Sequence, residues 1–346
     1  MEEKRTEINE IGEFGLIERI TAGWPQYQGS TRNGVGDDAA VIWAGDDCLL
    51  LSTDMLIEGI HFDLRYHPLS HLGYKAVAVN ISDIAAMNGV PQQITVSIGL
   101  TNRFSVEAVE ELYKGIRSAC DTYRVDLVGG DTTASASGLV LSVTVAGRIS
   151  PERLALRSGM RLNDILCVTG DLGGAYLGLQ VLEREKEVYL ADPEMQPQLD
   201  RYEYLIGRQL KPEARTDIVH EFNELGIVPR AMIDISDGLA SELMHLGHRS
   251  GLGVMIYEDK IPIDRQSYET ALEFGIDPIT AALHGGEDYE LLFAIDAETY
   301  EKLRKHADIP FIGHTTPEAE GFRLRSKAGQ VVELKAQGWN HFRDGA

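Results

Sequence analysis

Residues 73–100, with the sequence GYKAVAVNISDIAAMNGVPQQITVSIGL, decide the fold class of this chain. The first part is rich in alanine and repeats apolar residues at helical spacing, which predicts a helix over residues 71–88. An Asn-Gly pair ahead of Pro91 ends that helix, and ITVSIGL then predicts a strand. A helix that leads directly into a strand indicates a mixed α and β fold.

The same alternation extends to both sides of this stretch. In the first half, the other predicted elements are a helix over residues 11–22, two strands around the turn at 44–47, a helix over 106–123 and strands over 126–130 and 139–148. In the second half we predict strands over 165–170, 231–236, 253–261, 289–296, 311–316 and 322–326, helices over 175–185, 215–226, 238–251, 267–275 and 297–307, and a loop leading into a helix over 186–200. A polar, basic segment at 151–164 separates the halves. With 346 residues the chain suits two domains, which we expect at 1–150 and 151–346.

The composition is that of a globular, acidic protein. Hydrophobic residues make up 43% of the chain, and 54 acidic residues against 32 Lys and Arg give a formal net charge of −22. This balance argues against nucleic acid and against an anionic membrane surface as partners, because both require clustered basic residues. Polyanionic ligands are not excluded if metal ions lie between them and the protein.

Cysteine usage and hydropathy predict a cytoplasmic location. Cys48, Cys120 and Cys167 are scattered and form no disulfide framework, which favours a reducing compartment. The N-terminus lacks the apolar core of a signal peptide. No apolar run approaches the roughly 20 residues of a membrane-spanning helix.

Acidic residues recur in short motifs rich in glycine and serine, which we predict at strand ends. The six motifs are GDD (36–38), STD (52–54), ISD (81–83), GGDTT (129–133), DISDG (234–238) and GGED (285–288). Each motif alone is better explained by an ordinary turn or a helix cap. If they converge, their carboxylates repel one another and cannot all ionise without cations. Oxygen ligands without His or Cys favour Mg²⁺, so the set suggests a phosphate site with several Mg²⁺ ions.

The sequence also excludes several common phosphate-binding and catalytic motifs. It contains no G-x-x-x-x-G-K-[ST] loop, no protein-kinase signature and no G-x-S-x-G elbow. An enzyme that uses ATP would therefore hold the phosphates through metal ions and backbone groups.

Seven segments together resemble the thiamine-monophosphate kinase family. They are GVGDDAAVI (34–42), LSTDMLIEGIHF (51–62), GYKAVAVNISDIAAMNGVP (73–91), LVGGDTT (127–133), ALRSGMRLNDILCVTG (155–170), IDISDGLASEL (233–243) and LHGGEDYELLF (283–293). The resemblance runs from about Glu13 to Phe342. GDDAA, NISDIAAM and GGDTT occur in variants across a wider superfamily of ATP-using enzymes, whereas the combination of STD…G-x-H-F, IDISDGL and GGEDYEL is much more specific to this family.

The resemblance implies an α+β fold of two domains. The N-terminal domain would hold a mostly antiparallel sheet with helices and would mediate a homodimer, and the C-terminal domain would be α/β. The implied reaction transfers the γ-phosphoryl group of ATP directly, in line, to thiamine monophosphate, with Mg²⁺ and without a catalytic general base. ATP and thiamine monophosphate would be the ligands, and neither nucleic acid nor membrane would be a partner.

Site residues follow from the family motifs position by position. The implied metal ligands are Asp38, Ser52, Thr53, Asp54, Asp83, Asp131, Asp234 and Asp237. The implied ATP-binding residues are Tyr113, Gly129, Gly130, Asp131, Arg157 and Ser236. The implied substrate-binding residues are His61, Glu287 and Trp339. An acidic and an aromatic group suit the cationic thiazolium ring. Asp37 is open between a metal ligand and a turn residue, Tyr113 and Trp339 between ligand contact and packing, and Arg157 between phosphate contact and a surface charge.

Two rival functions follow from the same motifs. The first is another ATP-using enzyme of the superfamily, such as an aminoimidazole ribonucleotide synthetase. The second is a non-catalytic protein that binds nucleotide or thiamine phosphate. IDISDGL with GGEDYEL argues against the first, and the retention of every candidate metal ligand argues against the second.

Overall fold

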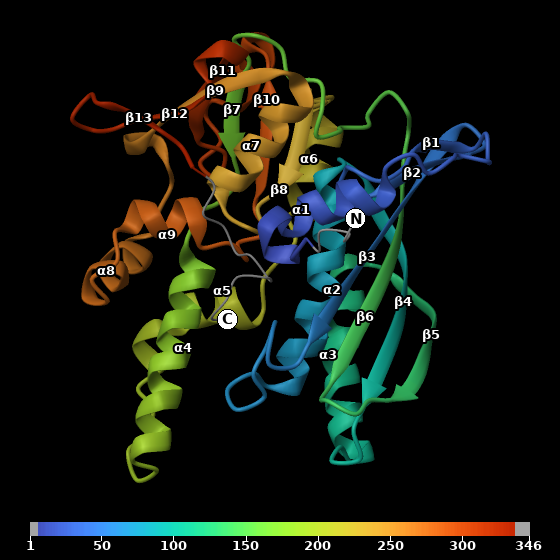
Figure 1. The fold of residues 1–346 in the computed structure, drawn as a ribbon, viewed down its shortest axis with the longest axis vertical. Helices are drawn as coiled ribbons and strands as arrows, with labels where there is room; N and C mark the ends of the chain where they lie inside the picture. Colours follow the sequence, from blue (N-terminus) through green and yellow to red (C-terminus); the bar gives the residue numbers. More distant parts are fainter. Residues whose placement is uncertain (1–5, 336–346) are drawn as a thin grey trace, which may run out of the picture.

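The first half of the chain forms a six-stranded sheet in the computed structural model, which describes residues 6–335 (Figure 1). The strands are β1 (Thr31–Asn33), β2 (Ala40–Ala44), β3 (Asp47–Ile57), β4 (Val90–Leu100), β5 (Asp126–Ala134) and β6 (Val140–Ile149). Their order is β1-β2-β3-β6-β4-β5. Every neighbouring pair is antiparallel except β4 with β5.

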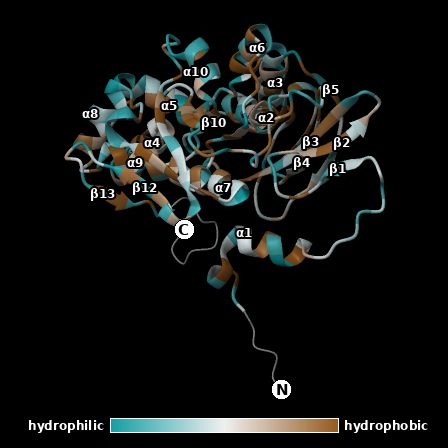
Figure 2. Ribbon diagram, turned by 90° about the horizontal axis from the view of Figure 1, so that it is seen from above, coloured by the Kyte–Doolittle hydropathy of each residue, from teal (hydrophilic) through white to brown (hydrophobic). Residues whose placement is uncertain are grey.

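Two helices cover one face of this sheet. They are α2 (Leu69–Ala86) and α3 (Val106–Tyr123), which pack against each other, and α2 also packs against β3, β4 and β6. The alternating residues Leu141, Val143 and Val145 of β6 point into this layer and are buried. A shorter helix, α1 (Ile8–Thr21), precedes the sheet and lies apart from the main body in Figure 2.

The second half forms a seven-stranded sheet. Its strands are β7 (Ile165–Val168), β8 (Ala231–Asp234), β9 (Leu252–Tyr257), β10 (Leu291–Ile295), β11 (Phe311–Pro317), β12 (Phe322–Arg325) and β13 (Val331–Glu333). The order is β13-β12-β9-β11-β7-β10-β8, and within this sheet only the pair of β9 and β12 is parallel among the described strands.

Helices enclose this second sheet on both faces. The helices of this half are α4 (Gly174–Ala191), α5 (Glu203–Leu210), α6 (Thr216–Leu225), α7 (Leu239–Ser250), α8 (Arg265–Glu273), α9 (Pro278–His284) and α10 (Ala297–Leu303), with short 3₁₀ turns at Asp200–Tyr202, Glu258–Lys260 and Glu318–Glu320. Of these, α4, α5 and α8 pack on one another in a cluster away from the sheet. Leu166 and Val168 of β7 join a core with α7, whereas Cys167 between them joins a core with α6 and α10. Burial on both faces explains the continuous apolar runs of these strands.

Helix α2 belongs to both halves. Most of it packs into the core of the first sheet, but Ala85 and Ala86 at its end are buried against Phe222 and Met232 of the second half. Figures 1 and 2 show α2 between the two sheets. One buried helix therefore fixes how the two halves of the molecule meet.

The mixed α+β fold with a mostly antiparallel first sheet is confirmed, and most predicted elements lie within a few residues of their predicted bounds. Several details were wrong. Helix α4 continues to Ala191, where a loop was expected, and helix α9 and the short strands β1 and β13 were not anticipated. The helix start expected before residue 200 corresponds to the 3₁₀ turn at Asp200–Tyr202 and helix α5. The division into domains at residue 150 stays a prediction, although β6 ends at Ile149 and β7 begins at Ile165.

Two further expectations concern the cysteines and the membrane. Cys48, Cys120 and Cys167 are all free thiols. Within residues 6–335, none of the helices has both the length and the apolar character needed to cross a bilayer.

Candidate active site

Four aspartate side chains from four elements gather where the two halves meet. They are Asp38 in the loop before β2, Asp54 on β3, Asp83 on α2 and Asp234 at the end of β8. Carboxylate oxygens of Asp38, Asp83 and Asp234 all lie within 4.8 Å of one another. Asp54 belongs with them, because its charge raises the pKa of both Asp83 and Asp234. The structure thus brings together four of the six aspartates that the resemblance assigns to metal ions.

Two serine hydroxyls hold carboxylates of this cluster. Ser52 Oγ on β3 donates a hydrogen bond of 2.5 Å to Asp83 Oδ2. Ser82 Oγ on α2 donates one of the same length to Asp234 Oδ2. Each bond joins two elements that are distant in sequence. The cluster is therefore a product of tertiary packing and not of one local motif.

Alternation along β3 decides which of its residues reach the cluster. Ser52 and Asp54 lie on the face covered by α2, where Asn80 Oδ1 accepts the backbone N–H of Asp54 at 2.9 Å. Thr53 lies between them on the opposite face, is exposed, and donates its hydroxyl to the backbone oxygen of Val143 at 3.0 Å. The side chain of Thr53 is therefore directed away from the acids. Only the backbone of this predicted metal ligand lies near the acid cluster.

Burial and mutual repulsion raise the pKa of every carboxyl in the cluster. The pKa of Asp54 rises from 3.8 to about 6, mainly through burial and then through the charge of Asp38. Burial and Asp38 likewise raise the pKa of Asp234 to about 7. The pKa of Asp83 also rises, through burial and the other three acids, and burial raises that of Asp38 against the opposing charge of Arg157. Four carboxyl groups that resist ionisation, two of them buried and two half-buried, suit a hard divalent cation such as Mg²⁺.

Arg157 supplies positive charge beside the cluster. Its guanidinium pairs with Asp38, with Nη2 2.8 Å from Oδ1, and its side chain is only 20% exposed. The interpretation of Arg157 as a surface charge is therefore wrong. Its backbone N–H donates to Asp37 Oδ1 at 2.6 Å, and Asp37 also accepts from Asn33 Nδ2. These bonds use the Asp37 carboxylate to fix the turn that carries Asp38.

The prediction that all the acidic motifs lie at strand ends is wrong for three of them. Asp54 and Asp131 lie within β3 and β5, because these strands go on pairing with β6 and β4 past the acids. Asp83 lies inside α2, which continues to Ala86 with its apolar face buried. The predicted convergence of the acids is nevertheless present, because helix α2, which carries Asp83, packs on strand β3, which carries Asp54.

The glycine-rich motif of β5 does not join the cluster within this chain. β5 is the edge strand, all nine of its residues are exposed, and it lies three strands away from β3, about 14 Å across the sheet. Strand register aligns Asp131 with Ser97, Ser142 and Met55, and thus places it on the outer face, opposite to Asp54. Within one chain, Asp131 therefore cannot contact a ligand bound at the cluster from the face that carries Asp54.

The two glycines of this motif differ in what the sheet demands of them. A Cβ at Gly130 would lie 1.8 Å from the backbone oxygen of Val96, so the sheet itself requires glycine there. A Cβ at Gly129 would make only an ordinary contact of 3.8 Å with Thr95. The packing of this chain therefore accounts for Gly130 and leaves Gly129 open to a role in ligand contact.

Two loops of the second half meet beside Asp234. Ser236 and Asp237 form the turn before α7, and Glu242 Oε1 accepts their backbone N–H groups at 3.2 and 2.8 Å. In the loop after α9, Gly286 has φ 70°, and a Cβ there would lie 2.5 Å from the backbone oxygen of Ser236. The N–H of Glu287 donates to that same oxygen at 2.7 Å. Glycine at 286 is what lets the two motifs touch.

The loop after α9 also lies beside the acid cluster. Tyr289 is buried, and burial together with the charges of Glu287, Asp54 and Asp234 raises the pKa of its phenol. Glu287 has φ 61° and forms an ion pair with Lys75 of α2. The structure therefore places the predicted substrate residue Glu287 next to the predicted metal site.

Three predicted residues remain. His61 follows β3 in the chain, and its Nδ1 accepts the backbone N–H of Ile57 at 3.0 Å, which puts the ring proton of the neutral imidazole on Nε2. Tyr113 packs, half-buried, against the core of the first half, as its packing interpretation predicts. Trp339 lies outside the described residues.

Sequence reasoning did not single out four polar residues that support this site. They are Lys75, Asn80, Ser82 and Glu242, all buried. Each lies inside a motif that carries the family resemblance, so the signal was present. The burial of Lys75 and Glu242 could not be predicted from the sequence. Apolar residues at helical spacing identify the core face of a helix, but they do not show which of the polar residues between them are also buried.

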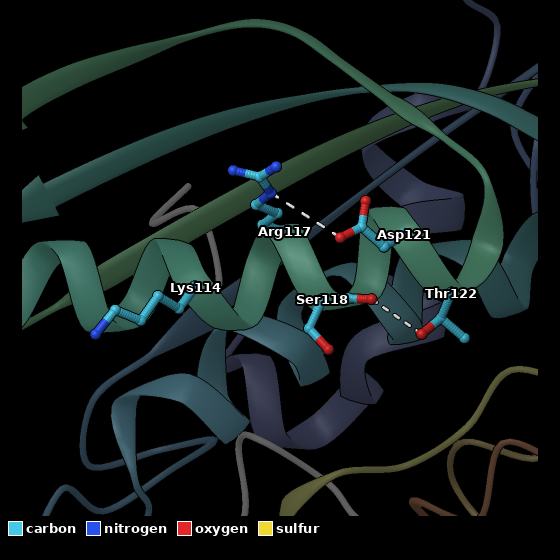
Figure 3. A pocket seen from close by; sticks show the side chains of 5 residues that line it. All are labelled: Lys114, Arg117, Ser118, Asp121 and Thr122. Atoms are coloured by element: carbon cyan, nitrogen blue, oxygen red, sulfur yellow. Dashed lines mark hydrogen bonds and ion pairs between the residues drawn. The ribbon is translucent and has the colours of Figure 1, made fainter.

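A second surface feature lies on the outer face of α3 (Figure 3). It is lined by Lys114, Arg117, Ser118, Asp121 and Thr122. Arg117 and Asp121 are 3.9 Å apart and largely exposed, and Thr122 donates back to its own helix. Such exposed pairs contribute little energy and gather no buried polar group, so this face does not compete with the acid cluster as a functional site.

Comparison with known proteins gives a consistent family. A family model described as AIR synthase related protein, N-terminal domain, matches residues 36–149. Thiamine-monophosphate kinase of Aquifex aeolicus is 35% identical over 336 residues, which cover 97% of this chain and 99% of the relative. The enzyme of the same name from Bacillus subtilis is 34% identical over 340 residues, covering 96% and 100%.

A solved structure shares the whole fold. It is AaThiL complexed with AMPPCP and TMP, which is 33% identical, has a TM-score of 0.83 and aligns over 99% of this chain and 100% of its own. These matches confirm the resemblance inferred from the sequence motifs, and the chain belongs to the thiamine-monophosphate kinase family of enzymes.

Proposed function

We propose that this protein phosphorylates thiamine monophosphate with ATP. A phosphate oxygen of thiamine monophosphate attacks the γ-phosphorus of ATP, a new P–O bond forms, and the bond to the β-phosphate oxygen breaks. The products are thiamine diphosphate and ADP. The second pKa of a phosphate monoester is near 6, so the attacking oxygen is already deprotonated at neutral pH and the chain needs no general base.

The observation that carries this proposal is the buried carboxylate cluster. Burial and mutual repulsion raise the pKa values of these aspartates, so their ionised forms are unfavourable when no cation is bound. Divalent cations remove this repulsion, and the cluster is therefore well suited to bind them. Mg²⁺ held by Asp38, Asp54, Asp83 and Asp234 would neutralise phosphate charge, which is the main demand of phosphoryl transfer.

Other residues of the chain take binding roles in this scheme. Arg157 would share its guanidinium between Asp38 and a nucleotide phosphate. Ser236, in the turn fixed by Glu242, would contact the nucleotide from the second half. Glu287 and His61 would bind the acceptor, and the assignments of Asp237, Tyr113 and Trp339 to ligand contact stay predictions. The solved complex of AaThiL with AMPPCP, an ATP analogue, and TMP supports this choice of ligands.

We also propose a homodimer that forms through the outer face of the first sheet. Leu51, Met55, Leu127 and Val128 are exposed on or near this face. Asp131 lies on the same face and about 14 Å from β3, so a second copy is the direct way to bring it to a nucleotide. The expected cytoplasmic location agrees with this scheme but does not depend on it.

The test is a product assay with purified protein, ATP and Mg²⁺. Thiamine monophosphate, free thiamine and an aminoimidazole-type phosphorylated acceptor are compared, and both ADP and the phosphorylated product are measured. We expect thiamine diphosphate only with thiamine monophosphate, and none after chelation of Mg²⁺.

Each alternative outcome points elsewhere. ADP release with the aminoimidazole-type acceptor would favour the superfamily rival. Tight binding of ATP and thiamine monophosphate without turnover would favour the non-catalytic binding protein. Neither result is compatible with the proposed reaction.

A further inference from the structure

Lys75 is a buried cation that the proposed reaction does not yet use. Its side chain lies on α2 and has no solvent exposure. A buried ammonium group is costly unless it is paired and hydrogen-bonded. Here the ammonium donates to the carboxylate of Glu287 and, at 3.0 Å, to the backbone oxygen of Gln209 on α5. Three segments that are distant in sequence therefore meet at one nitrogen.

The two carboxylate oxygens of Glu287 are not equivalent. Oε2 accepts from Lys75 and also from Gln209 Nε2 at 3.3 Å. Within residues 6–335, Oε1 accepts only a long hydrogen bond of 3.3 Å, from the Tyr289 hydroxyl. The Glu287 side chain keeps 31% exposure, whereas the Lys75 side chain keeps none. The accessible part of the pair is therefore the carboxylate, and Oε2 is its anchored end.

The backbone that carries Glu287 is fixed independently of Lys75. Glu287 and Tyr289 both have positive φ, 61° and 53°, which is rare for residues other than glycine and persists only where surrounding contacts impose it. Asp288 accepts the N–H of Gly173 at 2.7 Å. Two residues further on, Glu290 is buried in ion pairs with Arg208 at 2.7 Å and Arg215 at 2.6 Å. With the backbone held, the rotamer of the Glu287 side chain is what remains to be set.

The distance between the Lys75–Glu287 pair and the acid cluster suits an acceptor that spans both. Lys75 precedes Asp83 by eight residues on α2, which is about 12 Å along the helix axis. The charges of Asp54 and Asp234 help to raise the pKa of Tyr289, which lies two residues after Glu287. An acceptor whose phosphate lies at the acids and whose cationic ring extends away from them would reach Glu287.

We propose that Lys75 is a positioning residue that anchors Oε2 of Glu287 and so presents Oε1 to the cationic ring of the acceptor. The proposal rests on the proposed function, because it names thiamine monophosphate as the ligand that Glu287 meets. Lys75 acts through Glu287 and does not itself touch the reacting phosphates. The same contacts also explain why the lysine is buried at a junction of three segments.

The test separates this role from simple stabilisation of the fold. Lys75→Met keeps the length of the side chain and removes the ammonium. We expect the KM for thiamine monophosphate to rise about tenfold, and the KM for ATP to change by less than about twofold. Lys114→Met on the exposed face of α3 is the matched control and should leave both constants unchanged. Glu287→Gln should reproduce the defect, and the double variant should be no worse than either single variant.

A crystal structure of Lys75→Met provides a readout that does not depend on activity. We expect the Glu287 carboxylate to leave its present position. An unmoved carboxylate, or equal increases in the KM for both substrates, would overturn the positioning role. A wild-type protein that neither binds nor phosphorylates thiamine monophosphate would overturn the proposed function instead, and the position of Glu287 in the variant would still decide what Lys75 does.

Discussion

Ser82 and Asp234, 152 positions apart in the sequence, are joined by a hydrogen bond of 2.5 Å between Ser82 Oγ and Asp234 Oδ2. The neighbouring residue of α2, Asp83, accepts an equally short bond from Ser52 of the first sheet. Two consecutive residues of one helix thus bond to different halves of the molecule, since Ser82 donates to a carboxylate of the second half and the Asp83 carboxylate accepts from a serine of the first sheet. The geometry of the acid cluster depends on this helix more than on any loop.

Ser82→Ala should weaken both stability and activity. The hydroxyl is fully buried, and its loss leaves a buried carboxyl with one donor fewer. We expect the free energy of unfolding to fall by about 1–3 kcal/mol. We also expect kcat/KM to fall about tenfold, as when a group that orients a metal ligand is lost. Denaturant titration and steady-state kinetics measure the two effects, with exposed Ser118→Ala as control. Unchanged kinetics would show that Asp234 needs no such support.

The metal-free protein should lose stability as the pH rises between about 4 and 7. In this range the folded protein binds more protons than the unfolded chain, because folding raises the pKa of Asp54 to about 6 and of Asp234 to about 7 from 3.8. Stability that depends on these protons is therefore present at low pH and is lost as the pH rises through the folded values. Thermal denaturation in a chelator at several pH values measures this slope.

Added Mg²⁺ should reverse that loss. We expect Mg²⁺ to raise the Tm more at pH 8 than at pH 5, because ionised carboxylates bind the cation and protonated ones do not. A Tm shift that is the same at both pH values would contradict the assignment of the cluster to metal ions.

Asp54→Asn should affect activity and stability in opposite directions. Turnover should fall by about a hundredfold or more, since one ligand of the proposed cations is lost. In a chelator at pH 8 the variant should be more stable than the wild type, on the order of 2 kcal/mol, because one buried negative charge is removed. Asp46→Asn, in the exposed turn between β2 and β3, is the control. Near-normal turnover of Asp54→Asn would refute the role of Asp54.

The proposed dimer predicts complementation between variants. In a purified heterodimer of one Asp54→Asn chain and one Asp131→Asn chain, a site built from both copies combines an intact Asp54 with an intact Asp131 once per dimer. We expect about half of the wild-type activity, although each homodimeric variant is nearly inactive. An inactive heterodimer would mean that Asp54 and Asp131 act within the same chain.

The sequence predicted elements well where a single period governed them. Helix α3 has the predicted bounds, because Ser105 caps its first turn and Arg124 ends it in the left-handed conformation. Helix α9 was missed although Asp277 and Pro278 are a typical start, because a helix of seven residues gives too short a pattern. The end of α4 was missed because Val188, Tyr189 and Leu190 are consecutive and do not repeat at helical spacing, and this end of the helix is largely exposed.

Motifs identified the residues of the acid cluster, but their positions came only from packing. Asp83 was expected at a strand end and lies inside a helix, while the alternation of β3 separates Thr53 from its neighbours Ser52 and Asp54. Lys75 was hidden for a different reason. A lysine in an apolar helical pattern is usually exposed, and its burial depends on Glu287, which lies 212 positions away.

The exposed edge of β5 has a consequence for how this protein must be handled. An uncovered edge strand with Leu127 and Val128 in the open is a template on which other chains can add, and charged residues are what discourage such aggregation. Asp126 and Asp131 are the only charges of β5. An Asn at position 131 would thus remove a guard against aggregation together with a proposed ligand, so the solubility of that variant must be measured before its loss of activity is interpreted.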